Sequence, residues 1–285
     1  MVILVVGGHG QLGQALQSIE KEFPEVTFIF TDSDTLNILK PQEINAAFEQ
    51  FKPDYCINAS AYTAVDKAES EPELAQAINV EGVENLATAC KTYQTVLFHI
   101  STDFVFDGSK KTPYTEQDIP NPKGVYGQTK LDGEKVIQTC TEQYYIIRTS
   151  WLYSQFANNF MKTMLRLATE RDTLSIVNDQ IGTPTQAIDL AEVIMVIINY
   201  HKNHQYQPNY GLYHFSNEGQ CSWFEFAQSI FKKNNIKIHL NPIPTSAYPT
   251  PAQRPSYSVL DKSKIKNTFG IHIKKWEESL QPFPN

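Results

Sequence analysis

Apolar residues follow two different spacings along the first half of this chain. Residues 2–6 form a continuous apolar run, typical of a strand buried on both faces, and apolar positions then recur at helical spacing from Leu12 to Phe23. The alternation continues, with strands expected over 26–30, 55–58, 96–100 and 144–148 and helices from Pro41, over about 72–91 and over about 125–140. Strands that alternate with helices predict an α/β fold with a doubly wound parallel sheet of the Rossmann type.

The pattern changes beyond Trp151. Helices are expected over 158–171, 186–200 and 222–232, strands over 175–177 and 210–215, and the stretch 241–255 is rich in proline. We therefore expect two units: residues 1–150 with the parallel sheet, and residues 151–285 as a smaller C-terminal lobe. Helix 186–200 is strongly apolar, which predicts that it packs back on the sheet.

Composition narrows the class of protein. With 285 residues, of which 41% are hydrophobic and 19% charged, the chain can bury a full core. A formal net charge of −7 argues against nucleic-acid binding. No apolar run approaches the ~18 residues of a membrane span, and no basic leader is visible, so we expect no membrane segment and no signal peptide. The four cysteines form no Cys-x-x-Cys motif, which predicts reduced thiols and a cytoplasmic protein.

A glycine-rich turn follows the first strand. Gly7, Gly10 and Gly13 are spaced three apart, and Gly8, Gly10 and Gly13 also fit the pattern G-x-G-x-x-G. Such glycines let the backbone turn sharply and approach a pyrophosphate, and the N–H groups that begin the next helix can bind it. The alternative is a turn that holds no ligand. Its position directly after a buried strand favours a dinucleotide site, so residues 1–150 are predicted to bind NAD(P).

Asp32 follows the expected second strand, 19 residues after Gly13. A carboxylate there can accept a hydrogen bond from a ribose 2′-hydroxyl, which favours NAD over NADP. The alternative is a solvated turn aspartate beside Ser33 and Asp34. No arginine lies nearby in the sequence to hold a 2′-phosphate. Both NADPH and NADH therefore stay open as cofactors.

Tyr126 and Lys130 form a Tyr-x-x-x-Lys pair at the start of an expected helix. Spacing of four puts both side chains on one helix face, where the ammonium would lower the pKa of Tyr126 and suit it as a general acid for a carbonyl oxygen. Thr102, in the run S-T-D after the fourth strand, lies at the sheet edge where α/β folds bind ligands and can hydrogen-bond the same oxygen. The alternatives are a surface tyrosine beside a solvated lysine, and a capping hydroxyl.

Three further groups are candidates for ligand contact. Residues 61–63, Ala-Tyr-Thr, follow the third strand and either border a cofactor or form a loop in which Thr63 caps a helix. Trp151 either stacks on a flat ring or packs between the two units. Arg254, in the run P-A-Q-R-P, either holds a phosphate or is a surface arginine.

These segments together resemble the dTDP-4-dehydrorhamnose reductase family, a branch of the extended short-chain dehydrogenases/reductases, over essentially the whole chain. The segments that carry the resemblance are G-G-H-G-Q-L-G (7–13), N-A-S-A-Y-T-A-V-D-K-A-E (58–69), S-T-D-F-V-F-D-G (101–108), V-Y-G-Q-T-K-L-D-G-E (125–134), R-T-S-W-L-Y (148–153), N-N-F-M-K-T-M (158–164), N-D-Q-I-G-T-P-T (178–185) and A-Y-P-T-P-A-Q-R-P (247–255). Taken in order, these segments are far more specific than the G-x-G-x-x-G or the Tyr-x-x-x-Lys motif alone.

The resemblance implies NAD(P)H-dependent reduction of dTDP-4-dehydro-β-L-rhamnose to dTDP-β-L-rhamnose. It implies that Tyr126 donates the proton, that Lys130 activates it and anchors the cofactor ribose, and that Thr102 tunes the tyrosine. It also implies a binding lobe for the sugar nucleotide formed mainly by residues 151–285. The implied contacts are Gly10, Gln11 and Leu12 at the pyrophosphate, Ala61, Tyr62 and Thr63 at the middle of the cofactor, and Thr102, Asp103, Trp151 and Arg254 at the substrate.

The chain departs from the family at three positions. Asn37 stands where members often have an aspartate near the adenine, so it keeps an acceptor but lacks the charge. Gly124 stands where an asparagine commonly precedes V-Y-G. Some members dimerise through a metal held by glutamates, and Ala15 stands at one of those positions, where it offers no oxygen ligand. We therefore expect no bound metal, and a monomer or a metal-independent dimer.

Two other functions fit the same scaffold. One is a nucleotide-sugar epimerase or dehydratase, and the other is a non-catalytic NADP-binding regulatory subunit. Sugar dehydratases typically carry a glutamate after the T-D pair, where Phe104 cannot transfer protons. A regulatory subunit would be marked by loss of Tyr126 or Lys130, and both are present.

Overall fold

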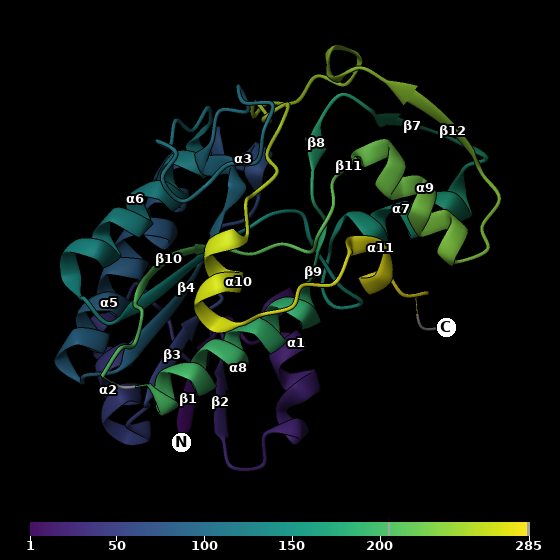
Figure 1. Ribbon diagram of the computed structural model, residues 1–285. Helices are drawn as coiled ribbons and strands as arrows, with labels where there is room; N and C mark the ends of the chain where they lie inside the picture. Colours follow the sequence, from purple (N-terminus) through teal and green to yellow (C-terminus); the bar gives the residue numbers. More distant parts are fainter. Residues whose placement is uncertain (205, 284–285) are drawn as a thin grey trace.

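A six-stranded parallel sheet lies at the centre of the protein, whose computed structural model describes residues 1–204 and 206–283. Its order is β10-β5-β4-β3-β1-β2. The strands are β1 (Val2–Val6), β2 (Thr27–Thr31), β3 (Tyr55–Asn58), β4 (Val96–Thr102), β5 (Tyr144–Thr149) and β10 (Gly211–His214). The prediction of a Rossmann-type, doubly wound α/β fold is confirmed (Figure 1).

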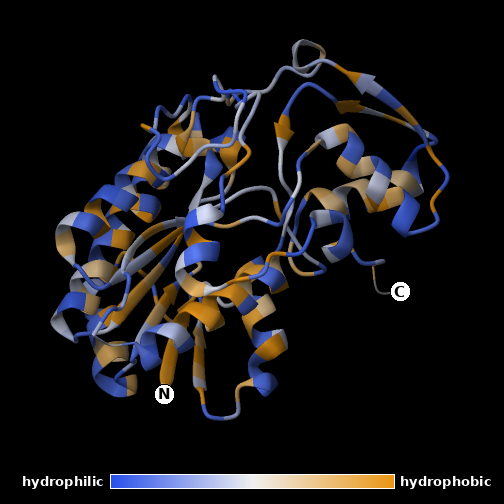
Figure 2. Cartoon of the chain, viewed as in Figure 1, coloured by the Kyte–Doolittle hydropathy of each residue, from blue (hydrophilic) through white to orange (hydrophobic). Residues whose placement is uncertain are grey.

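Helices cover both faces of this sheet (Figure 1). One face carries α1 (Gln11–Ile19), α8 (Ala187–Asn203) and α10 (Ser263–Phe269), and the other carries α2 (Pro41–Phe51), α5 (Gly82–Thr92) and α6 (Val125–Cys140). Strand β1 contributes to both cores, because Ile3 and Val5 join the first and Leu4 and Val6 the second. A strand buried on both sides has no polar face. This explains the continuous apolar run that opens the sequence, which is orange in Figure 2.

The other elements form a smaller lobe with its own core, in which Met161, Phe226 and Trp276 are buried. Its helices are α7 (Phe160–Glu170), α9 (Trp223–Lys233) and α11 (Trp276–Ser279). Its paired strands are β6 (Leu152–Tyr153) with β9 (Thr185–Gln186), β7 (Thr173–Val177) with β12 (His239–Ile243), and β8 (Ile181–Gly182) with β11 (Cys221–Ser222).

The chain crosses between sheet and lobe more often than the sequence suggested. Strand β10 is the sixth strand of the large sheet and α10 packs on that sheet, although both follow residue 150. Helix α8 packs on the same sheet, where helix 186–200 was expected. The expected helix over 72–91 is broken into α4 (Pro72–Gln76), a π-turn η2 (Ala77–Glu81) and α5. The assignment of nucleotide binding to residues 1–150 and of sugar binding mainly to residues 151–285 stays a proposal.

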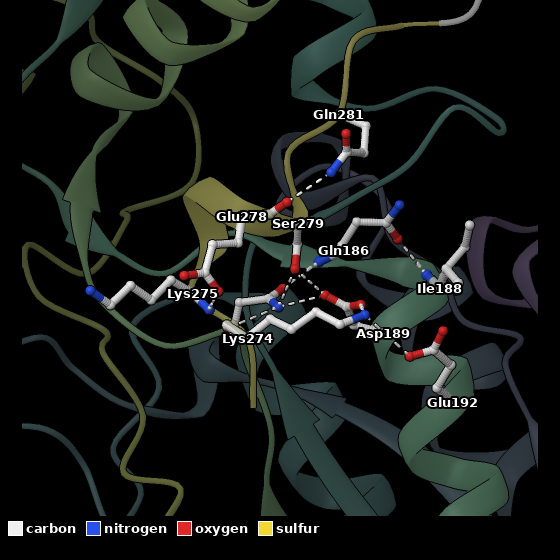
Figure 3. A network of polar contacts seen from close by, with 10 residues as sticks. Gln186, Ile188, Asp189, Glu192, Lys274, Lys275, Glu278, Ser279 and Gln281 are labelled. Carbon is white, nitrogen blue, oxygen red and sulfur yellow. Dashed lines mark hydrogen bonds and ion pairs between the residues drawn. The ribbon is translucent and has the colours of Figure 1, made fainter. Parts of the chain in front are cut away.

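A polar network joins the C-terminal segment to the first turn of α8 (Figure 3). The Asp189 carboxylate accepts hydrogen bonds from Asn217 Nδ2 at 2.6 Å and from the Ser279 hydroxyl, and it lies 3.2 Å from Lys274 Nζ. Asn217 Oδ1 also accepts the Gln186 N–H at 2.9 Å. Because Ser279 belongs to α11, these contacts fix the smaller lobe against a helix of the sheet.

The described helices include none that is long and apolar enough to cross a membrane.

Candidate active site

The candidate residues meet at the carboxyl edge of the parallel sheet. The glycine turn follows β1, residues 61–63 follow β3, and Asp103 follows β4, and these three strands are neighbours. The direction of strand addition reverses at β1, which has β2 on one side and β3 on the other. Such a reversal leaves a crevice outside the strand ends. Helix α6 packs on β4 and adds Tyr126 and Lys130 to the same edge.

The glycine turn has no room for side chains where it meets α1. Gly7 has a φ of +91°, in the left-handed region that favours glycine. A Cβ at Gly13 would lie 2.4 Å from the Gly7 carbonyl oxygen, so only glycine lets the helix approach so closely. Gly10 precedes α1, and neither a side-chain cap nor an acidic residue occupies the helix start. The N–H groups of that turn are suited to an anion, as a pyrophosphate requires.

The side chains of Gln11 and Leu12 point away from this anion site. Leu12 is buried in the core beside α1. Gln11 Nε2 donates to the Leu152 carbonyl at 3.2 Å, and Gln11 Oε1 accepts from Ser154 Oγ at 2.9 Å and from Asn159 Nδ2 at 3.0 Å. Only the backbone of these two residues can therefore contact a pyrophosphate. The Gln11 side chain instead ties the glycine turn to the smaller lobe.

Asp32 caps its own turn and also faces the glycine loop. Its Oδ1 accepts the N–H groups of Asp34 at 3.0 Å and Thr35 at 3.1 Å, and its Oδ2 lies 3.0 Å from His9 Nδ1. These interactions, led by the Asp34 N–H, lower the pKa of Asp32. The interpretation of Asp32 as a turn residue therefore describes its Oδ1, while its Oδ2 faces His9 of the glycine turn. Sequence reasoning did not pair His9 with it.

Asn37 uses its acceptor within its own loop. Its Oδ1 accepts the Leu39 N–H at 2.9 Å, and its N–H donates to Glu43 Oε2 at 2.9 Å. An adenine that donates to Asn37 Oδ1 would have to share that oxygen with the Leu39 N–H.

Residues 61–63 are held in place by an asparagine that sequence reasoning missed. Asn79 Oδ1 accepts the Tyr62 N–H at 2.9 Å, and Asn79 Nδ2 donates to the Tyr62 carbonyl at 3.2 Å and to Thr129 Oγ1 at 3.1 Å. Thr129 lies on α6 between Tyr126 and Lys130. Asn79 belongs to the π-turn η2, a feature found frequently at functional sites. The buried Tyr62 hydroxyl donates to Glu71 Oε2 at 2.6 Å, so the loop offers a ligand its backbone and the exposed Thr63.

Tyr126 is poised as a protonated phenol. Burial of its hydroxyl raises the pKa to about 12, a hydrogen bond with Thr102 partly offsets that rise, and the Asp103 carboxylate adds to it. The expectation that Lys130 lowers this pKa is not met in this structure. Lys130 Nζ instead donates to the Ile100 carbonyl at 2.7 Å and lies 3.2 Å from His99 Nε2. A phenol with so high a pKa keeps its proton at neutral pH, as a general acid must.

Asp103 offers a buried oxygen with no partner in the described part of the protein. The residue is 2% exposed, its Oδ1 accepts from Thr102 Oγ1 at 3.2 Å, and its Oδ2 has no hydrogen bond. Burial raises the pKa of this carboxyl to about 6. An unsatisfied oxygen at the strand end is suited to a hydroxyl of a bound sugar.

Trp151 packs against the core of the smaller lobe, and neither alternative expected from the sequence describes its contacts. Its indole stacks on Trp223 with ring centroids 3.5 Å apart and planes 9° apart. A Cβ built on Gly182 would lie 2.5 Å from Trp151 Cε2, 2.6 Å from Cζ2 and 2.7 Å from Nε1, so Gly182 lies directly against the indole. The Trp223 ring occupies one face of the indole, where a flat ring of a ligand would otherwise stack.

Arg254 has a carboxylate partner of its own. Its guanidinium forms two bonds to Asp66, Nη1 to Oδ1 at 3.0 Å and Nη2 to Oδ2 at 2.8 Å. Asp66 lies in α3 (Val65–Ala68), directly after residues 61–63. The pair therefore connects the proline-rich segment to the loop beside the candidate cofactor site, and a phosphate would compete with Asp66 for the guanidinium.

A buried ion pair joins β5 to α6, the helix that carries Tyr126 and Lys130. Arg148 Nη2 on β5 lies 2.6 Å from Glu134 Oε2 on α6, with side chains only 3% and 2% exposed, and the Ser101 hydroxyl donates to the same carboxylate. These residues were not among the predicted site residues. Arg148 could have been noticed, because it is the one charged residue of the largely apolar strand β5, whereas Glu134 stands among other charged residues of α6.

A dinucleotide-type glycine turn and a Tyr-x-x-x-Lys pair at one edge of a doubly wound sheet define a class of protein, the short-chain type of NAD(P)-dependent oxidoreductase. Comparison with known proteins specifies the family. The family model described as "RmlD substrate binding domain" matches residues 1–284, and the chain belongs to this family.

Named relatives agree with the resemblance seen in the sequence. The chain is 41% identical over 286 residues to the dTDP-4-dehydrorhamnose reductase of Salmonella typhimurium, covering 97% of this chain and 95% of the relative. A crystal structure of a dTDP-4-dehydrorhamnose reductase from Clostridium acetobutylicum is 42% identical with a TM-score of 0.92, over 99% of this chain and 97% of that one. The Bacillus anthracis enzyme of the same name, in complex with NADP, is 38% identical with a TM-score of 0.90, over 98% and 96%.

Proposed function

We propose that this protein reduces the C4 ketone of dTDP-4-dehydro-β-L-rhamnose to dTDP-β-L-rhamnose with NADPH or NADH, the last step of dTDP-L-rhamnose biosynthesis. Relatives named dTDP-4-dehydrorhamnose reductase match almost the full length of the chain. The observation that carries the proposal is the position of Tyr126 and Lys130 on α6, beside Thr102 at the end of β4. These are the groups that ketone reduction needs next to a dinucleotide site.

The chain's own residues fit a nicotinamide dinucleotide. The uncapped start of α1 and the side-chain-free glycine turn would hold the pyrophosphate, residues 61–63 would border the middle of the cofactor, and Asp32 would reach the adenosine ribose. When bound, reduced nicotinamide supplies a hydride for the ketone carbon.

Tyr126 supplies the proton. As negative charge builds on the ketone oxygen, the proton of the Tyr126 hydroxyl moves to that oxygen and leaves a phenolate. The Thr102 hydroxyl favours that phenolate, because it already opposes the rise in the pKa of Tyr126. Lys130, on the same face of α6 one turn later, adds a positive charge when protonated.

The structure around Tyr126 favours reduction over dehydration. The Phe104 ring packs edge-on against the Tyr126 ring, with centroids 5.6 Å apart and planes at 75°. The position after the T-D pair is therefore apolar and cannot assist the elimination of water.

Activity is tested with dTDP-4-dehydro-6-deoxyglucose, its 3,5-epimerase and NADPH or NADH, by following the loss of reduced-nicotinamide absorbance. We expect loss only when the epimerase is present, because the epimerase forms the rhamno-configured ketone. Equal loss without the epimerase would show that the substrate is a different ketone. No loss with either cofactor would contradict the proposed function.

We also propose that the protein works in the cytoplasm as a monomer or as a dimer that needs no metal. Its four cysteines are free thiols, three of them buried, which suits a reducing compartment. Ala15, where some relatives are expected to carry a metal ligand, is fully buried in the core beside α1.

A further inference from the structure

His99 is a buried titratable residue beside the candidate site to which the proposed function gives no task. It lies on β4 with 0% exposure, between Asn58 on β3 and Lys130 on α6. Its Nδ1 is 3.1 Å from Asn58 Nδ2, and its Nε2 is 3.2 Å from Lys130 Nζ. Both neighbours are nitrogen atoms. A neutral imidazole has one N–H donor and one acceptor, so the two contacts must have opposite direction.

The orientation of Asn58 decides which nitrogen of His99 carries the proton. Asn58 Oδ1 accepts the backbone N–H of Ser60 at 3.1 Å and the Ser60 hydroxyl at 2.6 Å. A backbone N–H can only donate, so the amide oxygen must stay on the Ser60 side. The Asn58 amino group therefore donates to His99 Nδ1. The imidazole proton is consequently on Nε2, directed at Lys130.

This tautomer is incompatible with a charged lysine at the same place. An ammonium has three donors and no acceptor, so it would oppose the Nε2–H donor of His99. An uncharged amine satisfies both contacts, because its lone pair accepts from Nε2–H while one of its own hydrogens goes to the Ile100 carbonyl at 2.7 Å.

We propose that His99, with its proton fixed on Nε2 by Asn58, is a positioning residue that stabilises the uncharged amine form of Lys130 at β4. Uptake of a proton from solvent by Lys130 then breaks the contact with His99 and frees the ammonium. Tyr126, one turn earlier on the same face of α6, is the group that gains from that charge. His99 thus couples the protonation of Lys130 to its availability at the tyrosine.

The charges around the pair agree with this assignment. Burial lowers the pKa of Lys130 to about 8, against an opposing effect of Glu134 on the same helix. Glu134 is itself paired with Arg148 on β5, and Asp103 follows β4. Burial alone holds the pKa of His99 below its usual value, so the ring stays neutral beside the uncharged amine. β3 contributes the uncharged Asn58.

Nitrogen-15 NMR of the full chain, labelled at histidine ring and lysine side-chain nitrogens, tests the proposal without substrate. The His99 proposal rests on the proposed function only for the catalytic task of Lys130. A protein that shows this tautomer but has no reductase activity would therefore refute the proposed function and leave the His99 proposal standing. We expect His99 to be neutral and protonated on Nε2 between pH 6 and 9, although an ordinary histidine, with a pKa of ~6.5, is largely charged at pH 6. We also expect Lys130 to titrate well below the ordinary ~10.4. Protonation on Nδ1 would overturn the proposal.

The variant His99→Gln separates positioning from packing. A glutamine amide can turn its oxygen toward an ammonium, so Lys130 should bind its proton at least about tenfold more tightly, a rise of about one pH unit. The alkaline limb of kcat/KM should move up with it, whereas damaged packing lowers kcat/KM equally at every pH. The matched control is His214→Gln, since His214 is equally buried but contacts Arg148. A Lys130 titration unchanged in His99→Gln, or shifted equally in the control, would contradict the proposal.

Discussion

At the scale of single residues, Tyr126 and Lys130 share a helix face but have different partners. Burial, with smaller opposing effects of Thr102 and Asp103, raises the pKa of the tyrosine, while His99 and the Ile100 carbonyl bind the lysine. The phenolic proton matters only as charge develops on the ketone oxygen. Its loss should therefore affect turnover and leave binding of the ground state intact.

Tyr126→Phe should lower kcat by about 10²–10⁴-fold, the usual range for general acid catalysis. The dissociation constant for NADPH, measured by fluorescence titration, should stay within about threefold of wild type, because the lost hydroxyl is not needed for the ground-state complex. If the variant kept more than about a third of the wild-type kcat, another group would be the acid.

Asp32 should permit the use of NADH, because its second oxygen is available to a ribose hydroxyl and repels a 2′-phosphate. Asp32→Asn keeps the acceptor for the N–H groups of Asp34 and Thr35 but removes the charge. Because solvent screens this charge, the NADPH-to-NADH ratio of kcat/KM should rise only modestly, by roughly fivefold.

Asp34→Asn is the matched control for Asp32→Asn, since it removes a neighbouring exposed carboxylate and should leave the ratio unchanged. A wild-type ratio above roughly a hundred in favour of NADPH would contradict this role of Asp32.

Sequence identified the residues whose chemistry is local and missed those whose partners are remote. Tyr126 and Lys130 are four apart, so their shared helix face follows from spacing. Asn79 meets Thr129 only because η2 packs against α6, and His99 meets Lys130 only because β4 does. Sequence spacing could not show that Asp66 pairs with Arg254 across 188 residues.

At the scale of elements, the contact between the glycine turn and α1 leaves no spare volume. Gly13→Ala would place a Cβ 2.4 Å from the Gly7 oxygen and 2.5 Å from Gly8 Cα, so the helix must move away from β1. Such overpacking costs about 1–3 kcal/mol. We expect a lower Tm in thermal unfolding and at least about tenfold weaker NADPH binding, since the displaced N–H groups no longer converge on one anion.

Gly10→Ala is the control for Gly13→Ala, because its Cβ would lie 3.3 Å from the same oxygen, a contact that a small shift relieves. Equal Tm values for Gly13→Ala and wild type would show that the turn is more adaptable than the structure indicates.

Element prediction succeeded where a repeating pattern was long enough. The strands of the sheet up to β5 and the helices α2, α6 and α9 begin within a few residues of their expected positions. The π-turn at 77–81 preserves helical spacing on average, so the sequence does not reveal it. Helix α11 has four residues and α10 seven, too short for a periodic signal, and β12 contains a proline that argues against a strand.

At the scale of the whole molecule, polar contacts join the sheet to the smaller lobe, and three of those in the described residues stand out. They are Gln11 with Ser154 and Asn159, Asp66 with Arg254, and the Asp189 network of Figure 3. The first two lie beside the glycine turn and the loop after β3. We therefore expect ligand binding at the proposed site to be coupled to the position of the lobe through these residues.

Asp189→Ala should destabilise the protein by about 2–3 kcal/mol, because it leaves Asn217 and Ser279 without their shared acceptor. Chemical denaturation measures the change in the free energy of unfolding. The control is Glu192→Ala on the same helix, whose carboxylate is 45% exposed and lies 3.6 Å from Lys274. It should cost less than about 0.5 kcal/mol. Equal losses in both variants would show that the network is not what holds the lobe.

A metal chelator should change neither the oligomeric state nor the activity. Ala15 offers no oxygen ligand, and its side chain is turned into the core. Light scattering and the activity assay, each with and without EDTA, measure both properties on the same sample. A dimer that dissociates or loses activity on chelation would show that other residues bind a bridging metal.

The central claim is that this protein delivers a hydride to C4 of the 4-dehydro sugar. Its most direct test is the conversion of dTDP-4-dehydro-β-L-rhamnose with nicotinamide cofactor deuterated at the transferred position, with the product analysed by NMR. The account predicts dTDP-β-L-rhamnose with one deuterium at C4 for each cofactor oxidised. Cofactor that stays reduced while the sugar is epimerised or dehydrated, or deuterium at any other carbon, would contradict it.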